Sequence, residues 1–257
     1  MTSWDAYSRH AWGNDTYHPV SQKGSNLSPH GPLGWIIIDS LDTLMLMNLT
    51  TQLSDSRKWL HRSLSYDQDQ DVNTFETTIR MLGGLLSAHH LVTSSHSLLP
   101  GHNISSLRDG IYLSKAIDLA DRLLGAFDSP SGIPYASVHL GKKVGIPSHD
   151  VTTSGGGTVE GITGGSSSLA EAATLQLEMK YLSHLTGDDR YWRAAERVMA
   201  VLDANAAEDG LLPIYVHPDT GSFTTREIRL GSRGDSYYGS SLFVAVAPLM
   251  LHRAGHH

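Results

Sequence analysis

The sequence predicts an all-α protein, and three observations lead to this class. Apolar residues recur at helical spacing in several stretches, whereas strand-like alternation is rare and brief. The best-defined stretch also begins and ends with residues typical of helix termini. The chain has 257 residues, enough to bury a core without disulfide or metal cross-links. It has no cysteine, which excludes disulfides, thiolate zinc sites and cysteine nucleophiles.

The helices follow in chain order. An apolar run that begins at Trp35 is too short to cross a bilayer and is therefore expected in the core. The stretch 168–186 starts with a capping box of Ser168 and Glu171, and Gly187 stops it. The next helix follows after a short turn, so these two helices should pack antiparallel. The expected helices are 35–49, 54–65, 72–93, 108–127, 168–186 and 188–206.

Two segments interrupt the helical pattern. Residues 128–167 are rich in Gly, Ser, Thr and Pro and predict a long loop, which in a compact domain is usually functional or disordered. Residues 210–230 contain two short β-like runs and predict a β-hairpin, with Gly221 at the turn position that needs a positive φ. Helix pairs joined by such loops should build a site at one end of the molecule.

Composition limits the partners. The chain has 26 Asp and Glu against 19 Lys and Arg, and this net charge of −7 argues against nucleic acid as a partner. Residues 1–15 contain neither the basic nor the apolar region of a leader, so a targeting signal is absent or lies outside this sequence, and a membrane anchor would lie upstream of it. Glycosylation sequons compatible with the secretory pathway begin at Asn14, Asn26, Asn48 and Asn103.

Two carboxylates lie within the first apolar run. Asp39 and Asp42 are three residues apart, which places them next to each other on one helix face. A buried carboxylate is costly unless it is paired, so the pair is a candidate polar site. The alternative is that Asp39 or Ser40 caps a helix beginning there. The spacing alone leaves both interpretations open.

Glu76 and Arg80 form an i,i+4 pair in an otherwise apolar stretch, and the apolar neighbours suggest that the pair is buried. A carboxylate beside a guanidinium in a cleft is a candidate acid or sugar contact. The alternative is a structural ion pair, which is the commoner case. No histidine motif of a zinc enzyme, phosphate-binding loop or G-x-S-x-G elbow occurs in the chain.

A glycine-flanked turn at 229–239 contains Arg233, Asp235, Tyr237 and Tyr238. Glycines let a backbone approach a ligand closely, and tyrosine beside charged groups is typical of a carbohydrate-binding surface. The alternative is a helix N-terminus capped by the aspartate or the following serine.

Five motifs in order resemble those of the class I α-1,2-mannosidases, glycoside hydrolase family 47. They are HAWGND (10–15), WIIIDSLDTL (35–44), FETTIRMLGGLLSAHHL (75–91), LAEAATLQLEMKYLSHLTGD (169–188) and SRGDSYY (232–238). The resemblance covers residues 1–238 and is closest to the endoplasmic-reticulum and Golgi enzymes of fungi.

The resemblance implies an (α/α)7 barrel, bound Ca2+, and inverting hydrolysis of terminal α-1,2-linked mannose on high-mannose N-glycans in the secretory pathway. Carried over to this sequence, Glu76 matches the proposed general acid and Asp235 the second essential carboxylate. Arg80 and Arg233 match arginines that contact the sugar. Asp39 and Asp42 match carboxylates that border the pocket.

The sequence departs from the family pattern after residue 238. A glutamate expected four residues after Asp235 is replaced by Gly239, and 239–257 resembles nothing in the family. The segments that carry the favoured base and the calcium-binding threonine have no counterpart, so no metal ligand is expected in this chain. We therefore expect 1–238 to be the N-terminal part of a catalytic domain, with about half of the barrel's helices, and 239–257 a divergent tail.

The expected activity of such a truncated chain is weak or absent. The alternative is a non-catalytic fragment that binds high-mannose glycans.

Overall fold

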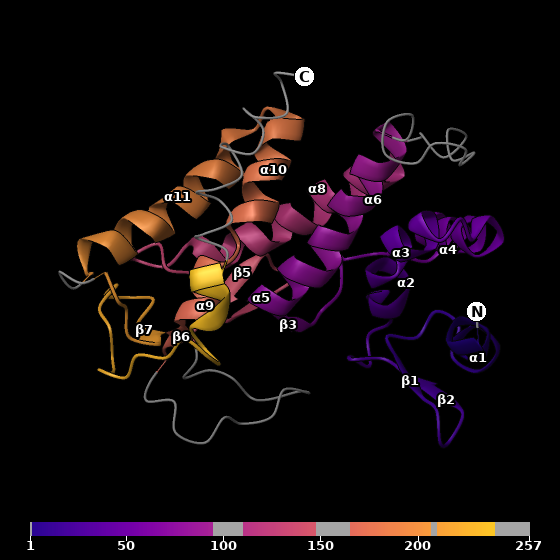
Figure 1. Cartoon of the computed structure of the whole chain (residues 1–257), viewed down its shortest axis with the longest axis horizontal. Coiled ribbons are helices and arrows are strands. Elements are labelled where there is room, and N and C mark those ends of the chain that lie inside the picture. The colour runs from indigo at the N-terminus through magenta and orange to yellow at the C-terminus, as the bar shows by residue number, and fades with distance from the viewer. Residues whose placement is uncertain (1, 95–109, 148–164, 207–209, 240–257) are drawn as a thin grey trace.

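A computed structural model describes residues 2–94, 110–147, 165–206 and 210–239 (Figure 1). The described part is mostly helical with small antiparallel sheets, so the helical class is confirmed and the sheets are an addition to it. Its helices are α1 (Thr2–His10), α2 (Trp35–Asp39), α3 (Leu41–Leu46), α4 (Thr50–Arg62), α5 (Thr74–Glu76), the π-helix η1 (Thr77–Leu82), α6 (Gly83–Thr93), α8 (Ile111–Leu123), the 3-10 helix η3 (Leu124–Phe127), α9 (Leu169–Ala173), α10 (Gln176–Thr186) and α11 (Asp189–Ala204).

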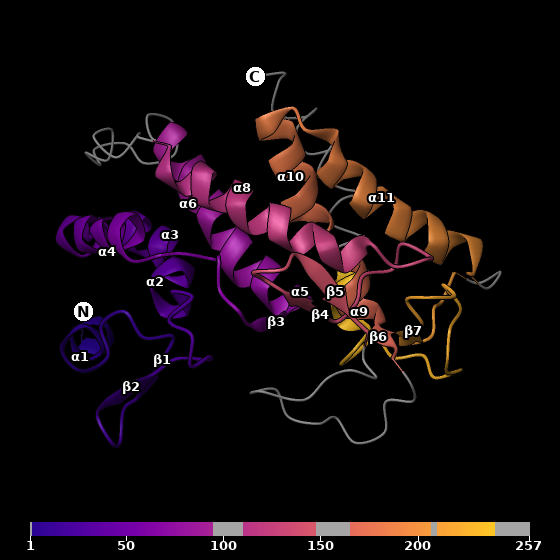
Figure 2. The same ribbon diagram turned by 180° about the vertical axis from the view of Figure 1, so that it is seen from behind.

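The strands form three antiparallel sheets in the described ranges. The first pairs β1 (Thr16–His18) with β2 (Lys23–Ser25). The second has the order β3 (Asp71–Asn73), β4 (Ser137–His139), β5 (Val144–Ile146). The third pairs β6 (Ser167–Ser168) with β7 (Tyr215–Val216). Figures 1 and 2 show β3 to β7 below α6, α8 and α10, whereas β1 and β2 lie below α2, beside α1.

The expected helix 35–49 is two helices. The chain bends at Ser40, whose hydroxyl donates to the carbonyl of Ile36 at 2.6 Å. A serine hydroxyl that occupies a backbone carbonyl competes with regular helix geometry, which accounts for the break. The second helix ends before Asn48, which has the left-handed φ of 54° that closes many helices.

The expected helix 72–93 starts later than predicted and is not uniform. Residues 71–73 form β3, and the side chain of Asn73 accepts the backbone N–H of Glu76 at 2.7 Å, so the helix begins at Thr74. The π-helix η1 follows before the α-helical pattern resumes in α6. A Cβ on Gly84 would lie 2.8 Å from the carbonyl oxygen of Ile38, so this glycine lets α6 pack closely on α2.

The other helix predictions are confirmed, with boundaries shifted by a few residues. Helices α4, α8 with η3, and α11 correspond to the expected 54–65, 108–127 and 188–206. Ser168 accepts the N–H of Glu171 at 3.2 Å, and its hydroxyl donates to the same carboxylate at 2.7 Å. Gly187 closes α10 with φ of 74°, and α10 and α11 pack together as the expected antiparallel pair.

The predicted helix 168–186 is nevertheless interrupted. Helix α9 ends at Ala173 and α10 begins at Gln176. The hydroxyl of Thr174, at the interruption, donates to the carbonyl of Ala170. As at Ser40, a side-chain donor on a backbone carbonyl accompanies the break.

The expected loop 128–167 contains the hairpin β4–β5 where it is described, and 148–164 lies outside the described residues. The expected hairpin at 210–230 is confirmed at its turn: His217 N–H donates to the carbonyl of Ser222 at 2.9 Å, and Gly221 has φ of 70°. Its first strand also pairs with β6, a partner that the local sequence does not reveal.

A buried carboxylate fixes the entry to α2. Asp15 is 4% exposed and accepts backbone N–H groups from Leu27, Leu33, Gly34 and Trp35. Burial raises the pKa of Asp15, and these hydrogen bonds oppose the rise because they favour the charged form. The network holds the loop before α2 and thereby sets the position of the first site residues.

The N-terminal helix α1 and the β1–β2 hairpin were not predicted. In the described ranges, no helix combines the length and apolar character needed to cross a membrane. The sequon at Asn103 and all of the tail after Gly239 lie outside the described residues.

Candidate functional site

An arginine lies at the centre of the candidate site. Arg80 Nε donates to Glu76 Oε2 at 2.7 Å, and Arg80 Nη1 lies 3.8 Å from Asp39 Oδ2. Its guanidinium carbon lies 5.8 Å from the ring centroid of Trp35. The hydrogen bond to Glu76 raises the pKa of Arg80, so this side chain is a fixed cation between two carboxylates.

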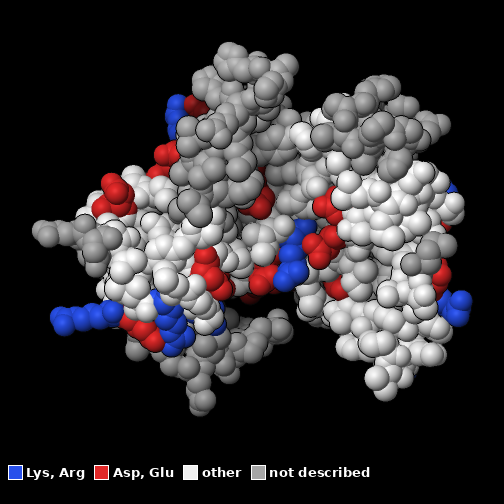
Figure 3. Space-filling model, viewed as in Figure 1, with Lys and Arg blue, Asp and Glu red and all other residues white. Residues whose placement is uncertain are grey.

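The prediction that Glu76 and Arg80 are buried is wrong. Their side chains are 40% and 44% exposed, because the apolar residues of η1, such as Met81 and Leu82, turn the opposite face to the core. Figure 3 shows acidic and basic side chains gathered in a hollow in the middle of one face. With 40% and 44% of their side chains exposed, Glu76 and Arg80 are open to a ligand, although such an exposed ion pair stabilises the fold little by itself.

The two aspartates of the first apolar run have different partners. Burial raises the pKa of Asp39, the charge of Arg80 opposes this, and the carboxylates of Asp42 and Glu76 raise it further. Asp42 accepts from Ser87 Oγ at 2.9 Å, which ties α3 to α6. Helix α3 begins after Ser40 without a side-chain cap, so the capping alternative is wrong for this position.

Arg233 lies in a second cluster, on the turn before residues 235–239. It adopts a left-handed φ of 75°, and its carbonyl accepts the N–H of Ala170 at 2.8 Å, which fixes the turn against α9. Arg233 Nη1 lies 3.7 Å from Glu171 Oε1. The same Glu171 oxygen lies 3.5 Å from Asn73 Nδ2, whose Oδ1 caps the helix at Glu76. Asn73 and Glu171 thus connect the two clusters.

Asp235 is exposed at the start of a short helical turn, 235–239, and its Oδ1 accepts the N–H of Ser236 at 2.8 Å. A helical turn therefore begins here, as the alternative predicted, but this bond comes from the N–H of the next residue and is not the predicted cap, which would accept from the second or third N–H of the turn. Of the two tyrosines, Tyr238 accepts the N–H of Leu212 on its hydroxyl oxygen at 3.1 Å, and the ring of Tyr237 lies edge-on to that of Tyr238, with 5.0 Å between the centroids.

Sequence reasoning missed several residues of the site. Glu171 was interpreted as a cap, whereas it also contacts Arg233 and Asn73. Trp35 was assigned to the core, but it lies beside Arg80. Apart from these contacts, Glu178 on α10 is partly buried, desolvation raises its pKa to about 7, and its Oε2 has no hydrogen-bond partner. The only local signal was the pattern of Glu171 three residues after Ser168.

The described residues do not fit a calcium site on their own. Calcium takes six to eight oxygen ligands, usually including several carboxylates. Within the described ranges, no three His, Asp or Glu side chains converge as metal ligands. The nearby carboxylates are instead engaged by Arg80, Ser87 and backbone N–H groups.

The fold and the site together define a class of protein: a helical protein with paired helices and an open cleft of carboxylates and arginines, suited to a polyhydroxylated ligand. The model of glycosyl hydrolase family 47 matches residues 1–243, and the chain belongs to this family.

Known proteins agree with the family. A mannosyl-oligosaccharide 1,2-α-mannosidase of Candida albicans is 52% identical over 238 residues, which are 93% of this chain and 37% of that protein. An endoplasmic-reticulum mannosyl-oligosaccharide 1,2-α-mannosidase of Saccharomyces cerevisiae is 46% identical over 93% of this chain and 42% of its own length. The chain thus spans less than half the length of these relatives.

A solved structure has the same fold over the shared part. The α-1,2-mannosidase from Trichoderma reesei superposes with a TM-score of 0.74 at 29% identity, covering 92% of this chain and 46% of that one. The resemblance predicted from the motifs is confirmed at the level of the family and of the fold.

Proposed function

We propose that the cleft acts on terminal α-1,2-linked mannose of high-mannose N-glycans, as part of an (α/α)7 barrel in the endoplasmic reticulum or Golgi. The observation that carries the proposal is the half-exposed Glu76, held by Arg80 beside Asp39. Glycosidases that invert configuration use two carboxyl groups about 6.5–9.5 Å apart, one that protonates the leaving oxygen and one that activates water.

In this mechanism Glu76 is the general acid. Arg80 occupies its Oε2, so the proton for the glycosidic oxygen would be carried on Oε1. The bond between the sugar carbon and that oxygen breaks as the proton is transferred. Asp235 is the second essential carboxylate of the site. The favoured base, which takes a proton from the water as its oxygen bonds to the sugar carbon, belongs to a segment of the family that has no counterpart in this sequence.

The remaining residues bind the sugar. Arg80 and Arg233 donate hydrogen bonds to hydroxyl oxygens, and Asp39 and Asp42 accept from hydroxyl groups. Asp39 is suited to this role because its side chain is 50% exposed, close to the fixed guanidinium of Arg80. The family also implies Ca2+, but because the described residues do not form a calcium site, no step is assigned to the ion.

The test is release of mannose from α-1,2-linked mannobiose in a buffer that contains Ca2+, with and without a chelator that removes the ion. Glu76→Gln should abolish any release. Asp189→Asn is the control, because Asp189 and Arg193 form an i,i+4 pair that is more exposed than Glu76 and Arg80 and lies on α11, which Figure 1 shows away from α2 and α3. A folded chain that releases no mannose would contradict catalysis by this polypeptide.

Calorimetric titration with a high-mannose oligosaccharide then separates binding from catalysis. If the unmodified chain gives a heat of binding but releases no mannose, and Arg80→Met gives no such heat, the non-catalytic glycan-binding alternative is supported. Absence of both heat and release would exclude both functions for this chain.

A further inference from the structure

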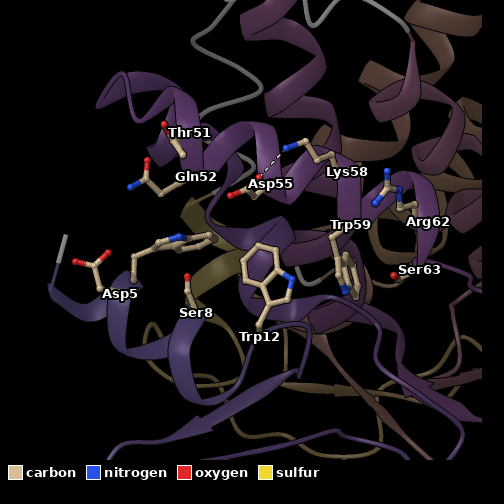
Figure 4. A pocket seen from close by; sticks show the side chains of 11 residues that line it. Asp5, Ser8, Trp12, Thr51, Gln52, Asp55, Lys58, Trp59, Arg62 and Ser63 are labelled. Carbon is tan, nitrogen blue, oxygen red and sulfur yellow. Dashed lines mark hydrogen bonds and ion pairs between the residues drawn. The ribbon is translucent and has the colours of Figure 1, made fainter.

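A second concave site lies between α1 and α4, and none of its lining residues belongs to the charged clusters described above. Its volume is about 570 Å³. Binding sites for small molecules commonly measure about 300–1,000 Å³ and combine apolar walls with a few polar groups. Figure 4 shows this arrangement, with α4 side chains on one side and residues of α1 and its following turn on the other.

Tryptophans form the aromatic wall of this α1–α4 pocket. The rings of Trp4 and Trp12 are 6.0 Å apart between centroids and nearly perpendicular, at 79°. Trp12 remains 37% exposed, so part of its indole is open to a ligand. Figure 4 shows the rings of Trp12 and Trp59 next to each other along the pocket.

Trp59 packs closely against two glycines. A Cβ on Gly13 would lie 2.8 Å from its Nε1, and a Cβ on Gly34 would lie 2.7 Å from its ring. Its indole therefore packs against two glycine backbones, and the residue is only 8% exposed. An aromatic wall that is fixed before binding lowers the entropic cost of holding a ligand.

Polar groups of α4 form the opposite side. Gln52, Asp55, Lys58 and Arg62 recur every three or four residues and so share one helix face, which borders the pocket (Figure 4). Lys58 Nζ donates to Asp55 Oδ1 at 2.9 Å, and both side chains are more than half exposed. Carboxylate, amide, ammonium and guanidinium groups together supply both acceptors and donors.

The charges select the class of ligand. Asp5 and Asp55 balance Lys58 and Arg62, so a cation would meet the basic groups and an anion would meet the carboxylates. A neutral molecule with many hydroxyl groups and one apolar face avoids both conflicts. A pyranose ring has this chemistry: its C–H face packs on indole, and its hydroxyls exchange hydrogen bonds with the polar row.

We propose that the α1–α4 pocket binds a neutral hexopyranose unit of a glycan, at a site separate from the cleft. This site goes beyond the proposed hydrolysis and does not depend on it. It would hold one sugar unit of an oligosaccharide while the cleft remains free for another.

Saturation-transfer NMR of the full chain with methyl α-D-mannopyranoside tests the proposal. Transfer should be seen with the unmodified protein and with Arg80→Met, which alters only the cleft. Trp12→Ala should weaken binding about tenfold and Asp55→Asn about threefold, through the lost ring contact and the lost acceptor. Trp192→Ala is the matched control, because this exposed tryptophan packs on Lys180, away from the pocket.

Three results would overturn the proposal. The first is no transfer at tens of millimolar sugar. The second is transfer that survives in Trp12→Ala but is lost in Arg80→Met, which would locate binding in the cleft. The third is displacement of the sugar by tetramethylammonium, which would assign the tryptophans to a cation site. If Trp12→Ala fails to fold, Asp55→Asn decides, since the Asp55 side chain is 53% exposed.

Discussion

The carboxylate of Asp15 accepts the backbone N–H of Gly34 at 2.7 Å, and this contact joins the turn after α1 to the first residue before α2. Oδ1 also accepts from Leu33 and Trp35, while Oδ2 accepts from Leu27. A single buried side chain thus orders the loop that precedes the site. Because α2 ends at Asp39, the position of that aspartate beside Arg80 depends on this network.

We expect Asp15→Ala to destabilise the protein by about 3 kcal/mol or more, because several buried N–H groups would lose their only acceptor. Asp15→Asn keeps an oxygen for three of the four donors and should cost about 1–2 kcal/mol. Urea unfolding of the two variants measures both losses. Equal losses would show that the charge of Asp15, rather than its acceptor geometry, holds the loop.

Gly84 should not tolerate a side chain. Its Cβ would lie 2.8 Å from the backbone oxygen of Ile38, which cannot move aside as a flexible side chain can, so Gly84→Ala should cost about 1–3 kcal/mol. Gly83→Ala is the control, because the nearest atom to its Cβ would be Glu178 Oε1 at 3.6 Å. That variant should be neutral or more stable by about 0.5–1 kcal/mol, since alanine favours helices. Thermal unfolding that ranks the two in the opposite order would contradict this packing.

Glu178 should make stability depend on pH. Burial raises its pKa from 4.5 to about 7, so the folded state binds its proton more tightly than the unfolded state does. The tighter proton binding of Glu178 therefore contributes fully to the stability of the folded state below pH 4.5, and this contribution is lost as the pH rises to about 7. Glu178→Gln lacks this loss and should exceed the unmodified protein in stability above pH 7 by up to about 3 kcal/mol.

The measurement for Glu178 is the free energy of unfolding from pH 4 to pH 8 for the two proteins, taken as a difference so that other groups cancel. Glu227→Gln is the control, because Glu227 is 51% exposed and pairs with Arg229. Parallel curves for the unmodified protein and Glu178→Gln would exclude a raised pKa at this position.

Features set by neighbouring residues were predictable from the sequence. The capping of Glu171 by Ser168, the stop at Gly187 and the positive φ of Gly221 all follow from local backbone geometry. The strands were harder to predict because β3, β4 and β5 have three residues each, too few for an alternating pattern, and they pair across distant parts of the chain.

The site was predictable only in part, for the same reason. The pair of Glu76 and Arg80 is local and was found, but its exposure depends on which face of η1 meets the core. The contact of Arg80 with Asp39 and that of Glu171 with Arg233 join separate elements. No spacing rule within one helix reveals such contacts, and the five ordered motifs pointed to Asp39, Arg80 and Arg233 as pocket residues without predicting which side chains meet.

Asn73 offers a test of the connection between the two clusters. Asn73→Ala removes both the cap of Glu76 and the contact with Glu171, so it should lower stability by about 1 kcal/mol and weaken binding of high-mannose glycan. Asn73→Asp keeps an oxygen for the cap but places a carboxylate where Nδ2 now lies 3.5 Å from Glu171 Oε1. Repulsion between the two carboxylates should displace Glu171 from its position near Arg233, so glycan binding should fall while the cap is retained. Calorimetry and urea unfolding of both variants separate these effects. If Asn73→Asp binds glycan as well as the unmodified protein, the connection through Glu171 does not contribute to the site.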